Sequence, residues 1–411
     1  MCGIIGYSGP KEPLPILISG LSRLEYRGYD SAGVALIDGD NLSIEKKEGK
    51  LSVLKEHLEG TSIKGNIGIG HTRWATHGVP SDVNAHPHAD NANEFAIIHN
   101  GIIENYAELK DDLIQDDYSF ISETDTEVVA VELSRKWNGE LLDTVLDVAK
   151  SLDGTYALVV TSTKQPGTIV AGRMMSPLVL GVGEGEVFLA SDSAAILEYT
   201  NKMIFLENGD FVEINDGNFT LYDIEKNVIT RDIQVIDWEV SEAEKAGHDH
   251  FMYKEILEQA EVIERTIAGR IEKNSTEIPI HLDKAKKFEK IWIVACGTAY
   301  HAGLFGKDLF EKVLGVPVSV ELASEFRYRE PIVGENDLGI VISQSGETMD
   351  TIAATELLKE NGAHVLALVN VVGSSLARMA DSVFYLHVGP EIGVASTKAY
   401  LGMLVGQLLL A

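Results

Sequence analysis

Residues 1–10 read MCGIIGYSGP, and the cysteine at position 2 bears directly on the fold and the chemistry of the chain. A small second residue permits removal of the initiator methionine, which leaves Cys2 with a free α-amine beside its thiol. One residue then supplies both a nucleophile and a base, so no separate histidine is required. The flanking GIIGYSG has the small residues and β pattern of a strand that can hold this terminus inside a fold.

A nucleophile that attacks an amide needs hydrogen-bond donors for the developing oxyanion. The sequence HNG at residues 99–101 comes after an apolar strand, and it predicts a tight turn whose backbone amides and Asn100 side-chain NH2 group suit that task. A plain hairpin turn is the alternative, since Asn-Gly favours such turns without any catalytic role. An amino-acid amide such as glutamine also carries an α-carboxylate and an α-ammonium, for which Arg73 and Asp125 are the candidate partners.

The first part of the chain, to about residue 222, alternates short β-type runs with glycine-containing turns. Apolar residues at three- and four-residue spacing predict helices at 104–115, 124–137 and 141–152. We therefore expect sheets with helices packed against them. Residues 223–285 are charge-rich and helical in pattern, which predicts an interdomain connection without strand pairs.

From residue 286 onward, near-continuous apolar strands alternate with helices, which indicates a parallel sheet covered on both faces. The sequence ends in the apolar helical run AYLGMLVGQLLLA (399–411) without a cap or a polar ending. This pattern favours a truncated chain. A natural C-terminus on a docked helix is the alternative.

Two turns rich in hydroxyl groups come after strands of this predicted sheet. SQSGET (343–348) joins a strand to a helix and presents hydroxyls and backbone NH groups where the helix dipole favours an anion such as a phosphate monoester. CGT (296–298) occupies the equivalent place after the first strand, at the edge where open parallel sheets bind ligands. A simple helix N-cap, for which Ser345 would suffice, is the alternative for SQSGET.

Composition narrows the class of protein. The 411 residues are 45% hydrophobic, which suffices for two domains with buried cores, and the formal net charge of −29 disfavours nucleic acid and anionic membranes. No apolar run of about 18 residues and no signal peptide occurs, so we expect a cytoplasmic protein. Cys2 and Cys296 are too few for a disulfide framework, and Cys296 reads as a core residue. Histidines 71, 77, 86, 88 and 99 raise the possibility of a metal site, but their spacing matches no metal motif, and we expect no metal.

Six motifs in the first half carry a family resemblance: MCGIIG (1–6), LEYRGYDSAG (24–33), HTRWATHG (71–78), NAHPH (84–88), HNGIIEN (99–105) and SETDTE (122–127). In this order they resemble the class II glutamine amidotransferase domain of the glutamine–fructose-6-phosphate aminotransferase family. The resemblance implies a role for each of these residues: Cys2 as nucleophile, Asn100 and Gly101 as oxyanion hole, Arg73, Thr76, His77 and Asp125 as glutamine-binding residues, Trp74 as a gate, and Arg27 in the loop that frames the site.

The second half resembles the sugar-isomerase (SIS) domain of the same family in ACGTAYHA (295–302), ELASEFRYR (321–329), SQSGETMDT (343–351) and EIGVASTKA (391–399). The resemblance implies that the sugar phosphate contacts Thr298, Ser343, Gln344, Ser345, Thr348, Val394 and Ser396. Ala299 stands where the family usually has serine, which puts one hydroxyl contact in doubt, and Val372 replaces a usual proline. The isomerising residues of the family would lie beyond Ala411.

The resemblance thus implies an α+β N-terminal-nucleophile domain of αββα layers at residues 2–222, a helical connection at 223–285, and a doubly wound α/β SIS subdomain, incomplete, at 286–411. The implied reaction transfers ammonia from glutamine to fructose 6-phosphate and yields glucosamine 6-phosphate and glutamate, without a cofactor and in a homodimer. We expect this chain to retain mainly glutaminase activity. The alternatives are an amidotransferase of another pathway and a regulator that only binds a sugar phosphate.

Overall fold

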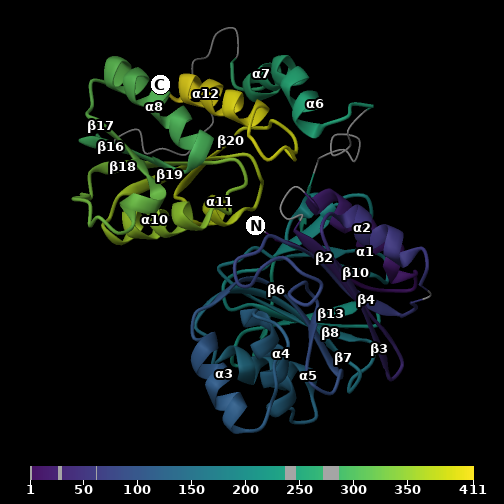
Figure 1. Cartoon of the computed structure of the whole chain (residues 1–411). Helices are drawn as coiled ribbons and strands as arrows, with labels where there is room; N and C mark the ends of the chain where they lie inside the picture. The colour runs from purple at the N-terminus through teal and green to yellow at the C-terminus, as the bar shows by residue number, and fades with distance from the viewer. Residues whose placement is uncertain (1, 26–29, 62, 237–246, 272–286) are drawn as a thin grey trace. The chain divides into compact units, whose positions relative to one another are not determined.

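Antiparallel strands form the first unit of the chain, Met1–Asp237, and parallel strands form the second, Trp238–Ala411, in the computed structural model (Figure 1). The structure describes residues 2–25, 30–61, 63–236, 247–271 and 287–411. Arg27, which the resemblance assigns to the loop that frames the nucleophile, lies outside the described residues.

Two antiparallel sheets make up the body of the first unit. The 8-stranded sheet has the order β15 (Gln234–Val235), β11 (Lys202–Phe205), β9 (Val179–Val182), β10 (Val187–Ala190), β1 (Gly3–Ser8), β4 (Ile67–Arg73), β2 (Ser31–Asp38), β3 (Asn41–Glu48). The 7-stranded sheet has the order β14 (Val228–Ile229), β13 (Asn218–Tyr222), β12 (Phe211–Asn215), β8 (Thr168–Met174), β7 (Gly154–Ser162), β6 (Phe95–Ile103), β5 (His88–Ala89).

The two sheets pack face to face because alternate residues of their strands are apolar. Ile4 and Ile69 of one sheet share a buried cluster with Ile98 and Val159 of the other. A second cluster joins the outer face of the 7-stranded sheet to its helices, α3 (Tyr106–Gln115), α4 (Asp125–Arg135) and α5 (Leu141–Ala149). The outer face of the 8-stranded sheet is covered by α1 (Pro13–Leu24), which contacts β1 and β4. The predicted αββα architecture is therefore confirmed (Figure 1).

Helices α3, α4 and α5 confirm the three helices predicted from periodicity, but α1 and α2 (Leu51–Leu58) were not predicted. The segment PLPILISGLSRL of α1 contains prolines and a glycine, which disfavour a helix locally. Its prolines lie at the start of the helix, where the missing N–H is tolerated, and Ile16, Leu17 and Leu21 are buried. Burial of this apolar face therefore outweighs the weak local propensity.

The segment from 223 to 285 differs from the expected connection without strand pairs. Its beginning forms β14 and β15, which pair with β13 and β11 and so extend the sheets of the first unit. Its helices, α6 (Phe251–Leu257) and α7 (Gln259–Ile267), belong to the second unit, where α7 packs against α12 (Lys398–Leu410). Each of these edge strands is only two residues long and lies in polar sequence, so no alternating pattern predicted it. The remaining parts, 237–246 and 272–286, lie outside the described residues.

The second unit is the expected parallel sheet with helices on both faces. Its order is β17 (Val318–Leu322), β16 (Lys290–Ala295), β18 (Asp337–Ser343), β19 (His364–Val369), β20 (Ser382–Tyr385). Its helices are α8 (Gly297–Leu314), α9 (Ala323–Phe326), α10 (Met349–Glu360), α11 (Ser375–Met379), α12, α6 and α7. The apolar cluster beneath α7, α8 and α12 fills one face of the sheet, while α10 and α11 cover the other (Figure 1).

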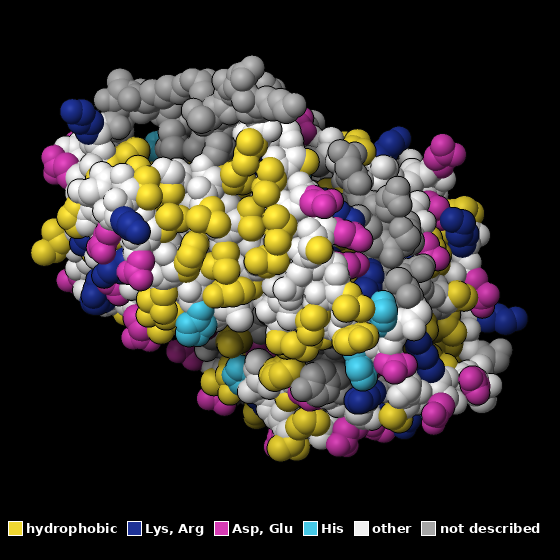
Figure 2. All heavy atoms as spheres, turned by 90° about the horizontal axis from the view of Figure 1, so that it is seen from above, with side chains coloured by type: hydrophobic (Ala, Val, Ile, Leu, Met, Phe, Trp, Pro, Cys, Tyr) yellow, Lys and Arg dark blue, Asp and Glu magenta, His cyan; other side chains and the backbone are white. Residues whose placement is uncertain are grey.

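One face of the second unit stays apolar and open. Hydrophobic side chains gather over its helices in Figure 2. Leu304 and Phe305 of α8 and Leu408 of α12 are among the exposed apolar side chains. An apolar surface of this kind marks an interaction site more often than it occurs by chance. Within the described part of the chain, no helix combines the length and the apolar character needed to cross a membrane.

Candidate active site

The site in the first unit forms where the inner faces of three strands change from apolar to polar. Alternate residues share a face of a strand, so Ile69 of β4 is followed on the inner face by His71 and Arg73, and Ile98 of β6 by Asn100. Cys2 bears the same relation to Ile4 of β1. The register of the strands brings these polar positions to one end of the layer between the sheets, because Gly3 pairs with Thr72 and Ile4 with His71.

Cys2 lies immediately before β1, a central strand bound on both sides by β10 and β4. Its Sγ accepts a hydrogen bond from the Trp74 amide at 3.2 Å and lies 3.5 Å from the Trp74 carbonyl oxygen. Burial raises the pKa of the Cys2 thiol, while the Trp74 amide and the charge of Arg73 oppose that rise. A thiol held in this way needs a base to become a nucleophile.

Asn100 and Gly101 do not form the predicted turn. They lie inside β6, where they pair with Ala157 and Tyr156 of β7. The long pairing of β6 with β7 overrides the local turn preference of Asn-Gly. Gly101 has a φ of +127°, and a Cβ atom there would lie 1.9 Å from the Thr155 carbonyl oxygen, so only glycine fits.

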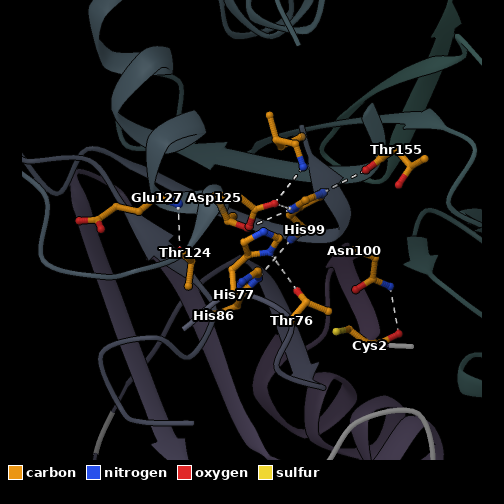
Figure 3. A network of polar contacts seen from close by, with 12 residues as sticks. Cys2, Thr76, His77, His86, His99, Asn100, Thr124, Asp125, Glu127 and Thr155 are labelled. Carbon is orange, nitrogen blue, oxygen red and sulfur yellow. Dashed lines mark hydrogen bonds and ion pairs between the residues drawn. The ribbon is translucent and has the colours of Figure 1, made fainter. Parts of the chain in front are cut away.

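The Asn100 side chain nevertheless points at the nucleophile. Its Nδ2 donates to the Cys2 carbonyl oxygen at 3.0 Å, as Figure 3 shows. The side-chain amide carries two hydrogens, and this bond uses one of them. The second hydrogen is therefore left for a donor role beside Cys2.

Arg73 organises the loop that comes after β4. This residue is 3% exposed, and its Nη2 donates to the carbonyl oxygens of His77 and Gly78. Its buried Nη1 has no hydrogen-bond partner among the described residues. A buried donor of this kind costs free energy unless a ligand satisfies it, and a carboxylate is the natural partner of an arginine.

The loop after Arg73 carries the next three residues that the sequence singled out. The Ala75 amide donates to Asp30 Oδ2 at 2.8 Å, which anchors the loop to the start of β2. Trp74 is 43% exposed and Thr76 lies at the surface as well, whereas His77 is half-buried against the ring of Tyr106. These side chains thus border the cysteine without filling its surroundings.

Asp125 occupies the first turn of α4. This helix begins there because the Thr124 side chain accepts a hydrogen bond from the Glu127 amide. Asp125 Oδ2 accepts from the Ile103 amide at 2.9 Å, and Oδ1 accepts from Thr126 Oγ1 at 3.3 Å. His99 approaches from the other side, with Nδ1 2.9 Å from Thr126 Oγ1 (Figure 3). The 5% exposed carboxylate is thereby fixed in place.

Buried histidines fill the space around this network. The rings of His71 and His86 stack with centroids 4.3 Å apart, and His86 meets His88 edge to face. Burial lowers the pKa of each of these three rings, so they are neutral. Within the part of the chain that the structure describes, no group of three or more His, Cys, Asp or Glu side chains is arranged to hold a metal ion.

His71 and Asp30 are site residues that sequence reasoning did not assign a role. His71 lies two positions before Arg73, so strand alternation alone places the two side chains on one face. That signal was present in the sequence. Asp30 offered no such signal, because its contact with Ala75 depends on the pairing of β2 with β4.

In the second unit, the two hydroxyl-rich turns meet at one edge of the sheet. Strands β16 and β18 are neighbours, with Ala295 in register with Ile342, so the turns after them lie side by side. Thr298, which is exposed, stands in the first turn of α8, and Ser343 is the last residue of β18. Helices α8 and α10 leave on opposite faces of the sheet, and in open parallel sheets ligands bind at the edge where this happens.

The SQSGET turn is shaped by bonds between its own members. Ser343 Oγ accepts from the Gly346 amide at 3.0 Å and lies 3.2 Å from Thr348 Oγ1, while Ser345 Oγ accepts from the Glu347 amide at 3.1 Å. The N-cap of α10 is Thr348, whose side chain makes no capping bond. Ser345 is thus not the helix cap that the alternative interpretation required.

Val394 and Ser396 lie on a different loop, between β20 and α12. Val394 is 74% exposed. Asn370 links this loop to the SQSGET turn, because its backbone amide donates to the Gln344 carbonyl and its side chain bonds the backbone of Val388 and Gly389. The structure records no direct contact of Val394 or Ser396 with the hydroxyls of the turn among the described residues. Ala299 packs into the apolar cluster beneath α8, which explains how a methyl group is accommodated there.

Comparisons with known proteins agree with this division. A glutamine amidotransferase domain family matches residues 55–236, and the SIS domain family matches residues 284–411. The chain is 51% identical over 415 residues to glutamine–fructose-6-phosphate aminotransferase [isomerizing] of Caldanaerobacter subterraneus subsp. tengcongensis, a match that covers 100% of this chain and 68% of that protein. The enzyme of the same name from Aquifex aeolicus is 48% identical over 404 residues, covering 98% and 68%.

Among solved structures, the chain is similar to glutamine phosphoribosylpyrophosphate amidotransferase of B. subtilis, complexed with ADP and GMP. The TM-score is 0.51 at 18% identity, and the match covers 98% of this chain and 95% of that one. Identity this low supports a shared fold and nothing about the acceptor.

Proposed function

The chain belongs to the glutamine–fructose-6-phosphate aminotransferase family, and from that premise we propose that Cys2 hydrolyses glutamine in the first unit while the SQSGET edge of the second unit binds fructose 6-phosphate as the ammonia acceptor. The family reaction is the glutamine-dependent amination of fructose 6-phosphate. The observation that carries the residue assignment is the Asn100 amide held beside Cys2.

The proposed chemistry begins at the thiol. The α-amine of Cys2, once Met1 is removed, takes the thiol proton, and Sγ attacks the glutamine carboxamide carbon to give a tetrahedral oxyanion. The free hydrogen of Asn100 Nδ2 and the Gly101 amide stabilise that oxyanion. As the intermediate collapses, the α-ammonium returns the proton to the leaving nitrogen, so the C–N bond breaks, ammonia departs and a γ-glutamyl thioester remains. Water then cleaves the thioester to give glutamate and the free Cys2 thiol.

The amino-acid end of glutamine has its own proposed partners. Arg73 offers a buried Nη1 without a partner among the described residues, which suits the α-carboxylate. The fixed carboxylate of Asp125 suits the α-ammonium, and Thr76 and His77 border the same loop. Trp74 is exposed next to Cys2, and we propose that its side chain acts as a gate over the site where ammonia is released.

The sugar phosphate is proposed to bind at the N-terminus of α10. Ser343, Gln344, Ser345 and Thr348 surround this helix end, and Thr298 stands on the neighbouring turn. The backbone amides of a helix N-terminus and nearby hydroxyls favour a phosphate monoester. Val394 and Ser396 are proposed to contact the sugar from the loop before α12.

Three measurements test this proposal. Intact mass should show a chain without Met1, and that protein should release glutamate from glutamine. Retention of Met1 in fully active protein would remove the α-amine as the base. Fructose 6-phosphate should bind to the second unit, whereas phosphoribosyl pyrophosphate should not; tighter binding of the latter would favour an amidotransferase of another pathway.

A homodimer in the cytoplasm is also proposed. The exposed apolar side chains of α8 and α12 support self-association, because an open apolar face of a helix pair is stabilised by burial against another copy. Sedimentation of the wild type and of a Leu304→Glu, Leu408→Glu variant tests the dimer. Equal mass for both proteins, at one chain each, would contradict it.

A further inference from the structure

His71 holds the other end of the Asn100 side chain. His71 Nε2 lies 2.9 Å from Asn100 Oδ1 and 3.1 Å from the His99 carbonyl oxygen, and all of these groups are buried. Asn100 Nδ2 meanwhile donates to the Cys2 carbonyl oxygen at 3.0 Å. The side-chain amide of Asn100 is therefore hydrogen-bonded at its nitrogen to Cys2 and at its oxygen to the ring of His71.

Two backbone carbonyls determine where the hydrogens lie in this chain of contacts. The Cys2 carbonyl can only accept, so the group of Asn100 that faces it must be the NH2 group, and the oxygen of Asn100 must face His71. The His99 carbonyl can only accept as well, so His71 Nε2 must carry a hydrogen. His71 thus donates from Nε2, and Asn100 cannot be reversed without placing two oxygens together.

The rest of the His71 ring fits this assignment. Its Nδ1 is buried and has no hydrogen-bond partner among the described residues, as expected for the nitrogen that carries no hydrogen. Burial lowers the pKa of His71 to about 3, so the ring stays neutral at physiological pH. The stacked ring of His86 fixes its plane.

We propose that His71 is the positioning residue of the oxyanion hole: it orients the Asn100 side chain so that the free amide hydrogen points at the oxyanion formed on Cys2. This inference rests on the proposed glutaminase function. His71 suits the task because its strand, β4, pairs directly with the nucleophile strand β1, while its ring reaches β6 of the other sheet. His71 therefore connects the strand next to the nucleophile with the strand that carries the donor.

His71 is not itself a catalytic residue. The Cys2 sulfur contacts the backbone of Trp74, and no contact of His71 with that sulfur occurs among the described residues. Its Nε2 is occupied by two acceptors, and its low pKa makes it a poor base. Its effect on the reaction must pass through Asn100.

The first test is His71→Phe, which keeps a flat ring against His86 but removes the donor. Asn100 Oδ1 is then buried without a partner, so its amide should rotate away from the catalytic position. We expect kcat for glutamine hydrolysis to fall roughly 10- to 100-fold, with KM changed by no more than about threefold. His71→Gln, whose NH2 group can reach the place of Nε2, should recover most of the loss.

A double-mutant cycle separates positioning from general damage. If His71 acts through Asn100, then His71→Phe should have no further effect on kcat in an Asn100→Ala protein. Additive losses would overturn the inference. Alkylation of Cys2 by iodoacetamide needs no oxyanion hole, so its rate should be unchanged in His71→Phe; a large change would indicate a disturbed nucleophile instead.

The result also distinguishes this inference from the function on which it rests. If Asn100→Ala leaves glutamine hydrolysis intact, the proposed oxyanion hole is wrong. If Asn100→Ala lowers kcat while a folded His71→Phe protein keeps the wild-type kcat, the oxyanion hole stands and the positioning role of His71 is overturned.

Discussion

Arg73 and Asn100 of the first site lie on strands of two facing sheets, and Asp125 lies at the start of a helix packed on one of them, whereas the residues of the second site lie on turns at the edge of one sheet. In the first unit, Arg73, Asn100 and Asp125 are between 3% and 6% exposed, and each is held by bonds to backbone or to another buried side chain. In the second unit, Thr298 is exposed and Val394 is 74% exposed.

This difference indicates two ways of building a site. A buried network fixes donors before the substrate arrives, which favours stabilisation of a transition state. A turn shaped by its own hydroxyls keeps its outer side open to a ligand, which favours binding. Substitutions of Cys2 and Asn100 should therefore change rates, and substitutions of the hydroxyl residues in the second unit should change affinities.

The largest difference between the two sites is expected for Cys2→Ala, which should affect glutamine hydrolysis but not sugar-phosphate binding. Loss of the nucleophile should lower glutamine hydrolysis by on the order of 10⁴- to 10⁶-fold. Fructose 6-phosphate affinity, measured by calorimetry on the same protein, should stay at the wild-type value. If the same substitution also weakened fructose 6-phosphate binding, the two sites would not act separately.

Asn100→Ala should produce the next largest effect. Removal of one oxyanion donor should lower kcat roughly 10²- to 10³-fold while KM for glutamine changes little, because Asn100 faces the reacting carbon and not the amino-acid end. Steady-state glutamate release provides both constants. A raised KM with normal kcat would instead assign Asn100 to substrate binding.

The second site is tested by Ser345→Ala and Thr348→Ala. Each lost hydrogen bond to a charged phosphate should cost about 1.5 to 3 kcal/mol, or roughly one to two decades in affinity. Thr348→Ser, which keeps the hydroxyl, is the matched control. Thermal unfolding should change little, since Thr348 makes no capping bond to α10. A lowered melting temperature with unchanged affinity would reverse the assignment.

The smallest effect concerns acid stability. An unfolded histidine has a pKa of about 6.5, and burial lowers that of His71 to about 3 in the folded chain. Between these values the unfolded state binds more protons, so the first unit keeps its full stability above pH about 6.5 and loses it as the pH falls toward 3. His86, His88 and His99 have lowered pKa values for the same reason and add to the loss.

For His71 the loss is about 1.4 kcal/mol for every pH unit between 6.5 and 3, which lowers the melting temperature of a unit of this size by roughly 3–6 °C per pH unit. Hydrogen exchange read by mass spectrometry reports the two units separately. The first unit should lose protection earlier as the pH falls, and His57→Gln, at a half-buried histidine that bonds Glu45 outside this network, serves as the control. Earlier loss in the second unit would contradict the prediction.

Much of this organisation was predictable from the residues. Strand alternation and helix periodicity predicted sheets with helices packed against them in the first unit and the parallel sheet of the second. The two hydroxyl-rich turns of the second unit lie side by side at one edge of its sheet, as their places after neighbouring strands predicted. The Asn-Gly pair misled, because a local turn preference says nothing about a strand such as β7 that arrives from more than 50 residues away; Asn100 pairs with Ala157. Helix α1 was not predicted because its local sequence disfavours a helix, and only the packing of its apolar face against the sheet stabilises it.

The bonds of the Asn100 network were out of reach of sequence reasoning. Alternation places His71 and Arg73 on one face, but only the packing of the two sheets shows that His71 meets Asn100 rather than a water or a metal. Contacts with a substrate likewise depend on distances that no pattern of residues contains.

The place of β1 in its sheet ties the nucleophile to the order in which the protein is made. The strand that begins after Cys2 is completed on one side only by β10, and the Ile4 amide donates to the Ser191 hydroxyl at 3.0 Å. During synthesis the first residues leave the ribosome long before residues 187–191 do. One edge of β1 therefore stays unpaired until β10 has been made. The residues around Cys2 are complete only when most of the first unit has been translated. Glutamine hydrolysis is therefore expected only from chains in which β10 has been made and has paired with β1.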